Sequence, residues 1–300
     1  MKILITGGLG FVGLYLSKKF IDSGNKVTIL EYKVPAKLSL DGVNIIEADS
    51  TIPGAWQKEL IKNDVIINLA GASIFQKWNN HSKKIIYDSR ILTTRNISSM
   101  LKKSKDKKIT LISTSAVGYY GFHGDEILNE DAAPGEDFLA NVAHDWEAEA
   151  LKAAGKNIRV IISRFGIVLG KNGGVIQQMA KVFNSYLGTR FGNGKQWFSW
   201  IHIDDLASIM EFFINKSKLD GPFNCTAPNP VTNKELTIAL SRALRKPVIF
   251  PFVPAFALKL AQGEMSNLVL KGQRVLPQRL LDAGFSFRFP RIQGALKDIC

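Results

Sequence analysis

A run of glycines near the start of the chain constrains the fold more than any other feature of the sequence. Residues 2–6 (KILIT) predict a short apolar strand, and residues 7–13 (GGLGFVG) follow directly, before a helical pattern. Glycine accepts φ angles that a Cβ disfavours, lets the backbone approach a pyrophosphate and allows close packing of helix on strand. The N-terminus of the following helix offers free N–H groups to phosphates. The sequence therefore predicts a dinucleotide-binding turn, formed by Gly7, Gly8, Gly10, Phe11, Val12 and Gly13.

An acidic residue closes the second predicted strand, which covers residues 26–31. A carboxylate at Glu31 can accept hydrogen bonds from the adenosine ribose hydroxyls and would repel a 2′-phosphate, so NAD is favoured over NADP. Lys33 and Lys37 follow closely and could pair with a 2′-phosphate if Glu31 turns away, which keeps NADP open. A solvated strand end is the structural alternative for Glu31.

The ends of the third and fourth predicted strands carry further candidate cofactor contacts. Asp49 could reach the adenine amino group, although capping a turn is an equal alternative. Leu69, Ala70 and Gly71 lie at the carboxyl edge of the predicted sheet, where ligands bind in such folds, and small residues there admit a flat cofactor.

Short apolar runs alternate with helical patterns through the first half of the chain, as expected for βαβ units and a parallel sheet. Strands are predicted over residues 2–6, 26–31, 43–47, 65–69, 109–113 and 159–163. One helix places Ile86, Thr93, Ile97 and Leu101 on a single face. Beyond residue 164, glycine, proline and aromatic residues become frequent and the elements shorter. We therefore predict a cofactor domain over residues 1–164 and a smaller substrate lobe over residues 165–300 that packs against it discontinuously.

The charge balance does not by itself choose a partner. Lys and Arg total 39 against 26 Asp and Glu, a formal charge of +13. The densest basic run, Lys102, Lys103, Lys105, Lys107 and Lys108, lies between a helix and a strand, where a solvated connection is expected. Because no nucleic-acid motif accompanies it, we expect no nucleic-acid partner.

Cysteine usage and hydropathy bear on the compartment. Cys225 and Cys300 are far apart and form no CxxC or Cys/His cluster, so neither a disulfide framework nor a metal site is predicted. Because a predicted strand begins directly after Met1, we expect no targeting segment. The longest apolar stretch, residues 248–261, is interrupted by prolines and a lysine and falls short of the about 20 residues that span a bilayer. We expect a cytoplasmic monomer or homodimer with a small-molecule substrate and no membrane partner.

Several motifs of the sequence resemble those of a known family. Residues 6–13, 68–71 (NLAG) and 113–117 (STSAV) look like the extended short-chain dehydrogenase/reductase family. Residues 89–95, 115–121, 146–147, 196–205, 227–232 and 263–265 resemble its uncharacterised "epimerase family protein" branch. The resemblance implies a Rossmann-type doubly wound parallel sheet, a nicotinamide cofactor and a smaller C-terminal α/β lobe across a cleft. Arg90, Ser113 and Arg164 become further candidate cofactor contacts, and Arg164 could instead hold the loop that follows it.

The catalytic residues of that family are only partly present. Members commonly use Ser or Thr, Tyr and Lys, the last two as Tyr-x-x-x-Lys, and by alignment Ser115 takes the serine place, where it would polarise a substrate oxygen. The helix expected to carry the other two, residues 138–147, has neither. The matching string from Tyr15 to Lys19 lies on the first helix and is interpreted as chance.

A tyrosine could still act as an acid. Without a lysine, a tyrosine with a pKa near 10 is about one part in a thousand ionised at pH 7, which costs a base about 4 kcal/mol. As a proton donor it carries no such cost, so Tyr119 or Tyr120 could protonate a carbonyl oxygen during reduction. Loop packing is the alternative for both. Glu147 could serve as an acid or base or hold a loop, the structural role being favoured, and His144 is expected to be exposed.

The second lobe carries the candidate substrate contacts Gln196, Trp197, Phe198 and Trp200. Sugar-nucleotide members of the family commonly have a diphosphate-binding arginine where this chain has Phe198, so a typical nucleotide sugar is not expected, although Lys195 or Arg190 could compensate. At least one of the three aromatic residues is equally explained by core packing, because alternate residues of a strand face opposite ways. Asp204 or Asp205 is predicted to cap a helix.

Two functional hypotheses follow. The first is an NAD(P)-dependent oxidoreductase or epimerase-like enzyme of this type, lacking the Tyr-x-x-x-Lys pair, that acts on a small carbonyl or alcohol. The second is a dinucleotide-sensing regulatory protein that kept the cofactor cradle and lost the chemistry, with the link to cell division that the resemblance suggests.

Overall fold

A seven-stranded parallel sheet forms the centre of the computed structural model, which describes residues 1–36, 40–104, 106–171 and 173–300. The strand order is β11-β7-β5-β4-β1-β2-β3. The strands are β1 (Lys2–Thr6), β2 (Lys26–Glu31), β3 (Val43–Glu47), β4 (Val65–Asn68), β5 (Ile109–Ala116), β7 (Ile158–Phe165) and β11 (Gly221–Cys225). All six predicted strands are present, and β11 is the additional one.

The register of the strands brings their carboxyl ends to one edge. Thr6 pairs with Leu30 on one side and with Asn68 on the other, and Asn68 pairs with Ser113. Most interior positions of these strands are apolar and buried, as a parallel sheet covered on both faces requires. The polar residues that end the strands therefore meet at a single edge.

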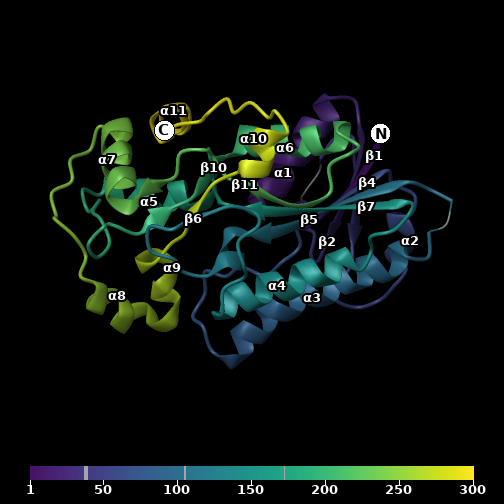
Figure 1. The fold of residues 1–300 in the computed structure, drawn as a ribbon, viewed down its shortest axis with the longest axis horizontal. Helices are drawn as coiled ribbons and strands as arrows, with labels where there is room; N and C mark the ends of the chain where they lie inside the picture. Colours follow the sequence, from purple (N-terminus) through teal and green to yellow (C-terminus); the bar gives the residue numbers. More distant parts are fainter. Residues whose placement is uncertain (37–39, 105, 172) are drawn as a thin grey trace.

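Helices cover both faces of the sheet (Figure 1). The helices α1 (Phe11–Asp22) and α6 (Ile203–Asn215) lie on one face, and α3 (Asn80–Leu101), α4 (Phe138–Leu151) and the short α2 (Gln57–Leu60) lie on the other. The predicted stripe on α3 is confirmed, since Ile86, Ile97 and Leu101 are fully buried. A capping box between Asn79 and Ser82 fixes the start of this helix, and the Asp137 side chain caps α4.

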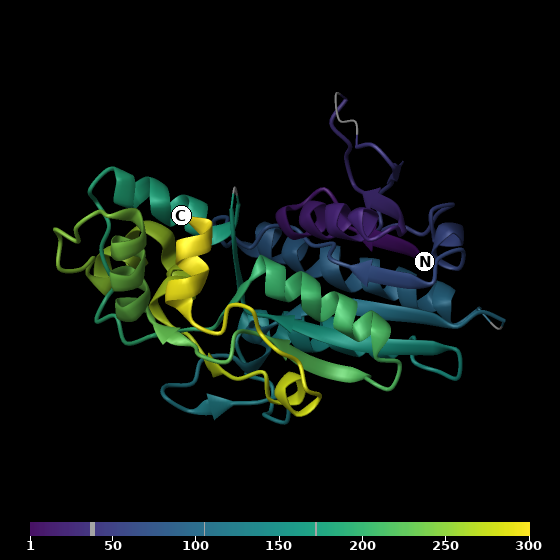
Figure 2. The same cartoon turned by 90° about the horizontal axis from the view of Figure 1, so that it is seen from above.

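The second lobe lies beside the sheet rather than over it (Figure 2). Its helices are α5 (Gly174–Asn184), α7 (Asn233–Leu244), α8 (Ala255–Gln262), α9 (Asn267–Leu270) and α11 (Ile292–Ile299). Short strands pair β8 (Ile167–Gly170) with β10 (Trp200–His202) and β9 (Trp197–Phe198) with β12 (Val231–Thr232). Its core gathers Trp200, Phe183, Leu236 and Leu240.

The two lobes interleave along the chain. Both α6 and β11 lie beyond residue 164 and pack with the central sheet. Near the C-terminus, β13 (Arg274–Val275) pairs with β6 (Ile127–Leu128), and α10 (Gln278–Asp282) contacts β11. The 3-10 turns η1 (Val117–Tyr120) and η2 (Gly263–Ser266) complete the fold. A division of the chain at residue 164 stays a prediction.

The basic run after α3 is mostly exposed. Lys102, Lys103 and Lys108 are exposed, Lys107 forms an ion pair with Asp64 at 2.8 Å, and Lys105 lies outside the described residues. None of the described helices combines the length and the apolar character needed to cross a bilayer.

Candidate functional site

The glycine turn after β1 leaves no room for side chains on its inner side. Gly7 has φ +66°, in the left-handed region, and its N–H donates to the Leu30 carbonyl at 2.9 Å. A Cβ on Gly8 would lie 2.7 Å from the Ile29 side chain, and one on Gly13 would lie 2.6 Å from the Gly7 carbonyl oxygen. Gly10 caps α1 without a side chain, so no side-chain cap competes with a ligand for the first N–H groups. The turn has the shape that a dinucleotide pyrophosphate requires.

The loop after β4 is fixed directly beside this turn. The Leu69 N–H donates to the Thr6 carbonyl at 3.1 Å, and the Ala70 N–H donates to the Thr6 hydroxyl at 3.3 Å. The same hydroxyl donates to the Asn68 side chain at 2.7 Å, and Asn68 in turn donates to Thr94 on α3 at 2.8 Å. This buried chain of hydrogen bonds holds the two cofactor-side loops in register.

Arg90 on α3 contacts the loop after β4. Its Nη1 donates to the carbonyls of Ala72 and Ile86, each at 3.0 Å, and a Cβ on Gly71 would lie 2.9 Å from its Cζ. Burial lowers the pKa of Arg90 to about 10. The ion pairs of the described residues include none with Arg90, and its contact with a cofactor stays a prediction.

At the adenine end, Glu31 is tied to the glycine turn. Its carboxylate accepts hydrogen bonds from the N–H groups of Leu9 at 3.0 Å and Tyr32 at 3.1 Å. Lys33 is exposed, and Lys37 lies outside the described residues. The Asp49 carboxylate accepts from the Thr51 N–H at 2.9 Å and from its hydroxyl at 2.6 Å, which is the geometry of a turn cap.

A buried polar cluster joins β5, α4 and β7 at the carboxyl edge of the sheet. The Ser115 hydroxyl donates to Glu147 Oε1 at 2.6 Å, and Arg164 binds both oxygens of the same carboxylate at 2.8 Å. Burial disfavours the charged guanidinium, but the hydrogen bonds with Glu147 outweigh it and raise the pKa of Arg164. Because the Ser115 hydroxyl donates its hydrogen bond to Glu147, the lone pairs of its oxygen are what this arrangement leaves for a ligand. The role of Ser115 in polarising a substrate oxygen stays a prediction.

The two candidate tyrosines have different surroundings. Tyr119 is half-buried and its ring stacks on the Arg164 guanidinium, with the Cζ atom 3.6 Å from the ring centre. Tyr120 is fully buried, accepts from Arg164 Nη1 at 2.8 Å and donates to Asn224 at 2.7 Å, and burial raises its pKa to about 12. Tyr120 thus fits the packing alternative. Arg164 is engaged by Glu147, Tyr120 and the Glu130 carbonyl, which fits the structural alternative, and its contact with a cofactor stays a prediction.

Ser113, also a candidate cofactor contact, is buried in β5. Its hydroxyl has no hydrogen-bond partner among the described groups. Phe11 packs its ring against the turn before α5, where a Cβ on Gly173 would lie 2.2 Å from it. The Phe11 ring therefore packs against the segment before α5, and a cofactor contact by its backbone stays a prediction.

Sequence reasoning missed two buried polar residues behind this cluster. Glu130 accepts hydrogen bonds from the backbone N–H of Asn224 at 2.9 Å and of Arg279 at 3.3 Å, and burial raises its pKa. The Asn224 side chain also donates to the Leu276 carbonyl at 2.9 Å. In the sequence, Asn224 between the apolar Phe223 and Cys225 could have indicated a buried polar group, but this strand was not predicted.

A cavity of about 430 Å³ opens between the lobes, beside the loop that follows η1. Its walls include Phe122, Asp125, Lys195, Trp197 and Lys271. The Trp197 indole donates to Asp125 at 2.8 Å, and Lys271 lies 5.1 Å from the centre of the Phe122 ring. The cavity therefore combines aromatic surface with two exposed ammonium groups.

The four candidate substrate residues divide between this cavity and the core. Gln196 and Trp197 line the cavity, although the Gln196 amide donates to the carbonyls of Phe191 and Val269. Phe198 packs partly against the core of the second lobe. Trp200 is fully buried there, which agrees with the core-packing alternative for at least one of the three aromatic residues. Substrate contact by any of the four stays a prediction.

The predicted helix cap after β10 needs a correction. The His202 side chain caps α6, accepting from the Asp204 N–H at 3.1 Å. Asp205 instead accepts from the N–H groups of Arg288 and Phe289, at 2.8 and 2.9 Å. Tyr15, on α1, donates to the Asp204 carboxylate, which places it away from the Ser115 cluster.

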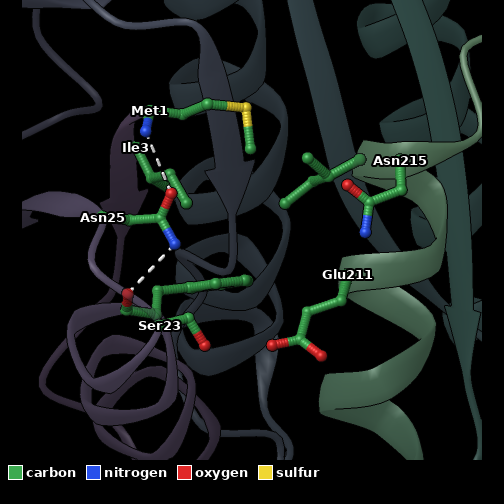
Figure 3. Close-up of a pocket in the computed structure, with 8 residues that line it drawn as sticks. Met1, Ile3, Ser23, Asn25, Glu211 and Asn215 are labelled. Carbon is green, nitrogen blue, oxygen red and sulfur yellow. Dashed lines mark hydrogen bonds between the residues drawn. The ribbon is translucent and has the colours of Figure 1, made fainter.

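A second pocket lies at the opposite edge of the sheet. It has a volume of about 330 Å³ and is bounded by Met1, Asn25, Glu211 and Asn215, between α1 and α6 (Figure 3). Met1 donates through its amino group to Asn25 at 3.1 Å. Because it borders the amino end of β1, this pocket is separate from the cofactor turn.

Comparison with known proteins identifies relatives over the whole chain. Residues 3–225 match the NAD dependent epimerase/dehydratase family, and residues 253–299 match a domain of unknown function, DUF1731. The Epimerase family protein YfhF of Bacillus subtilis is 38% identical over 301 residues, covering 100% of this chain and 98% of that protein. The crystal structure of human epimerase family protein SDR39U1 with NADPH has a TM-score of 0.88 at 30% identity, covering 100% and 99% of the two chains. A nucleoside-diphosphate sugar epimerase from Corynebacterium glutamicum gives 0.79 at 33% identity, covering 99% of this chain and 57% of that one.

Proposed function

The chain belongs to the NAD dependent epimerase/dehydratase family, and on this premise we propose that it is an NAD(P)-dependent oxidoreductase or epimerase-like enzyme acting on a small carbonyl or alcohol. One observation carries the proposal. Tyr119, a half-buried phenol, stacks on a charged arginine at the sheet edge where the cofactor turn lies. A proton donor and a dinucleotide cradle thus share one edge of the fold.

The residues of the turn fit a nicotinamide dinucleotide. The Gly7–Gly8 backbone and the first N–H groups of α1 would hold the pyrophosphate, and Arg90 would supply a positive charge beneath the loop after β4. When bound, the cofactor exchanges a hydride with a substrate carbon. The NADPH in the human relative supports a nicotinamide cofactor for this chain.

For the cofactor preference we propose NAD. The Glu31 carboxylate is fixed by Leu9 and Tyr32, so its negative charge stays at the end of β2. A ribose 2′-phosphate placed there would be repelled, whereas free ribose hydroxyls would find an acceptor. Lys33 and the NADPH of the human relative favour NADP, so the preference depends on Glu31.

In the reducing direction, Tyr119 donates its hydroxyl proton to the substrate oxygen. The Arg164 guanidinium beneath the ring lies where it can stabilise negative charge that develops on the phenol oxygen. Glu147 and Ser115 hold Arg164 in this position and are positioning residues. This arrangement takes the place of a tyrosine and lysine on one helix.

The cavity between the lobes sets the proposed substrate class. Phe122 and Trp197 offer flat apolar walls, and Lys195 and Lys271 offer point charges. Phe198, where a bidentate arginine would hold a diphosphate, packs on the core. A small carbonyl or alcohol with a flat body and an anionic group fits these walls better than a typical nucleotide sugar.

Single-turnover oxidation of bound NADH or NADPH by a panel of small carbonyl compounds tests the proposal. Tyr119→Phe should lower the rate of the chemical step by about 100-fold while leaving the cofactor Kd unchanged. Tyr120→Phe is the matched control, because its hydroxyl is buried, and it should change stability more than rate. Tight cofactor binding with no oxidation by any compound would contradict an enzymatic role.

A second function is favoured by one specific observation. Ser115, Tyr120 and Glu147 are buried in hydrogen bonds to other protein groups, which suits a cofactor-sensing protein as well as an enzyme. Such a protein would capture a partner to an extent that changes when NAD(H) or NADP(H) is added. Capture that is indifferent to both cofactors would argue against sensing.

A further inference from the structure

Residues 248–261, the longest apolar stretch of the sequence, are not among the residues that line the cavity beside the η1 loop. This stretch runs from the end of α7 through a loop into α8, at the end of the molecule farthest from the N-terminal strands (Figure 1). Together with the end of α5 and the turn after it, we name residues 182–187 and 246–262 the apolar basic edge.

Large apolar side chains stand out from this edge into solvent. Leu260 is 89% exposed, Phe256 is 74% exposed and Ile249 is 60% exposed. Other members are also exposed: Val182, Tyr186, Leu187, Val248, Phe250 and Phe252. Soluble proteins rarely expose so many neighbouring apolar groups without a binding role.

Hydrogen bonds connect the two segments of the edge, directly and through the residues that follow α5. Thr189 donates to the Phe250 carbonyl at 2.8 Å, and Lys246 donates to the Tyr186 hydroxyl at 3.1 Å. The Val253 N–H donates to the Arg190 carbonyl at 2.9 Å, which aligns the loop with the segment that follows α5. On α8, Leu258 packs inward while Phe256 and Leu260 point outward on the opposite face.

The charge of the edge has a single sign. The sequence has no Asp or Glu between residues 150 and 203, nor between residues 236 and 263. The basic residues that flank the exposed apolar groups are Lys181, Arg190, Arg242, Arg245, Lys246 and Lys259. The edge is therefore complementary to a negatively charged apolar phase and repels a second copy of itself.

Prolines hold the exposed loop in a restricted set of conformations. Pro247, Pro251 and Pro254 fix three φ angles within eight residues of chain. Aromatic groups presented on such a loop lose little conformational entropy when they insert elsewhere. The exposed side chains are thus pre-positioned as a group.

From these observations we propose that the apolar basic edge docks the protein on the surface of an anionic lipid bilayer. Phe256, Leu260 and the aromatic groups of the loop enter the boundary between headgroups and acyl chains, and the flanking lysines and arginines pair with lipid phosphates. The contact is peripheral, because no described helix can cross the bilayer. This revises the expectation of no membrane partner, which considered only a spanning segment.

Sedimentation of the full chain with lipid vesicles tests the proposal directly. Vesicles of phosphatidylcholine with phosphatidylglycerol should carry the protein into the pellet at low salt, and vesicles of phosphatidylcholine alone should leave it in solution. Leu260→Ser should weaken binding by about fivefold to tenfold, through lost insertion. Lys259→Glu should weaken it by about tenfold or more, because it reverses a charge at the surface.

Matched variants on the cofactor domain separate a specific edge from general basic charge. Leu151→Ser on α4 also removes an exposed leucine, and Lys156→Glu also reverses an exposed lysine. Both should bind vesicles like the unaltered protein. Equal losses for the edge and control variants would overturn the proposal, as would an unaltered protein that stays in solution with anionic vesicles.

Two further measurements keep the outcome clear. A cofactor Kd that is unchanged in every variant shows that each variant is folded. Because vesicle binding is measured without turnover, the result does not depend on the proposed enzymatic function. Analytical ultracentrifugation reports self-association. A dimer that Leu260→Ser abolishes would assign the edge to a second copy of the chain and overturn the lipid assignment.

Discussion

At the scale of single residues, the ion pair between Glu147 and Arg164 decides what the neighbouring groups can do. It lies almost wholly away from solvent, where an unpaired charge would be costly, and both carboxylate oxygens are used. The Ser115 hydroxyl donates a hydrogen bond to this carboxylate, and the Tyr119 ring stacks on the guanidinium. One ion pair thus engages the Ser115 hydroxyl and holds the guanidinium on which the Tyr119 ring stacks.

Glu31 gives a prediction at the same scale. Glu31→Gln keeps an oxygen that can accept from the Leu9 N–H but removes the negative charge at the end of β2. The ratio of the Kd for NADP⁺ to the Kd for NAD⁺ should fall by about tenfold, the size of one charge repulsion across several ångströms in a partly solvated site. Isothermal titration calorimetry with both cofactors measures it.

The control for this substitution is Asp22→Asn, which removes an exposed carboxylate at the far end of α1. Its Kd ratio should match that of the unaltered protein. An unchanged ratio in Glu31→Gln would show that the carboxylate does not face the ribose.

At the scale of elements, the packing of α1 against the glycine turn gives the next prediction. In Gly13→Ala the new Cβ would lie 2.6 Å from both the Gly7 carbonyl oxygen and the Gly8 Cα, which are backbone atoms that cannot rotate away. We expect α1 to shift, the free energy of unfolding to fall by about 1–3 kcal/mol and the cofactor Kd to rise. Urea denaturation and calorimetric titration measure the two effects.

Gly294→Ala is the matched control, because it places the same substitution in helix α11 with nothing within 4 Å of the new Cβ. There the helix propensity of alanine should raise the free energy of unfolding by up to about 1 kcal/mol. Destabilisation of similar size at both positions would mean that the turn is not the cause.

The elements that the sequence predicted are those with a strong local pattern. β1 and β4 are continuous runs of buried apolar residues, and α3 carries an apolar stripe at helical spacing. β11 was not predicted, because it begins with Gly221 and Pro222 and contains Asn224, which are weak strand formers. Its place at the sheet edge depends on pairing with β7, a contact that no local pattern encodes.

The candidate site was predictable to the same extent. The glycine spacing indicated the cofactor turn because it depends on consecutive residues. The partners of Ser115 were not predictable, because Glu147 and Arg164 come from a helix and a strand that only the tertiary fold brings together. Trp197 and Trp200 are close in sequence but lie on two short strands, β9 and β10. Only the structure shows that Trp197 lines the cavity and that Trp200 lies in the core.

At the scale of the whole molecule, the two lobes meet at a histidine. His202 ends β10 and caps α6. The centre of its ring lies 3.9 Å from the centre of the Phe289 ring, and its Nε2 lies 3.6 Å from the Asp298 carboxylate on α11. Burial lowers its pKa, while Asp204, Asp298 and Asp205 oppose that shift and Arg288 adds to it. The neutral form of His202 therefore belongs to the assembled fold.

This gives the stability of the molecule a pH dependence with a definite sign. The unfolded chain takes up a proton at His202 as pH falls through its ordinary value of about 6.5, whereas the folded chain takes it up only at lower pH. Stability is therefore complete above that value and should fall by up to about 1.4 kcal/mol per pH unit below it, until the folded pKa is reached. Urea denaturation at pH 7.5 and 5.5 measures the loss.

His202→Asn isolates this contribution, because asparagine can accept from the Asp204 N–H as a helix cap but does not titrate. The other histidines, His81, His123 and His144, are not buried and remain in both proteins. The variant should thus lose less free energy of unfolding between pH 7.5 and 5.5 than the unaltered chain. Equal losses in the two proteins would place the acid sensitivity elsewhere in the fold, away from the junction of α6 and α11.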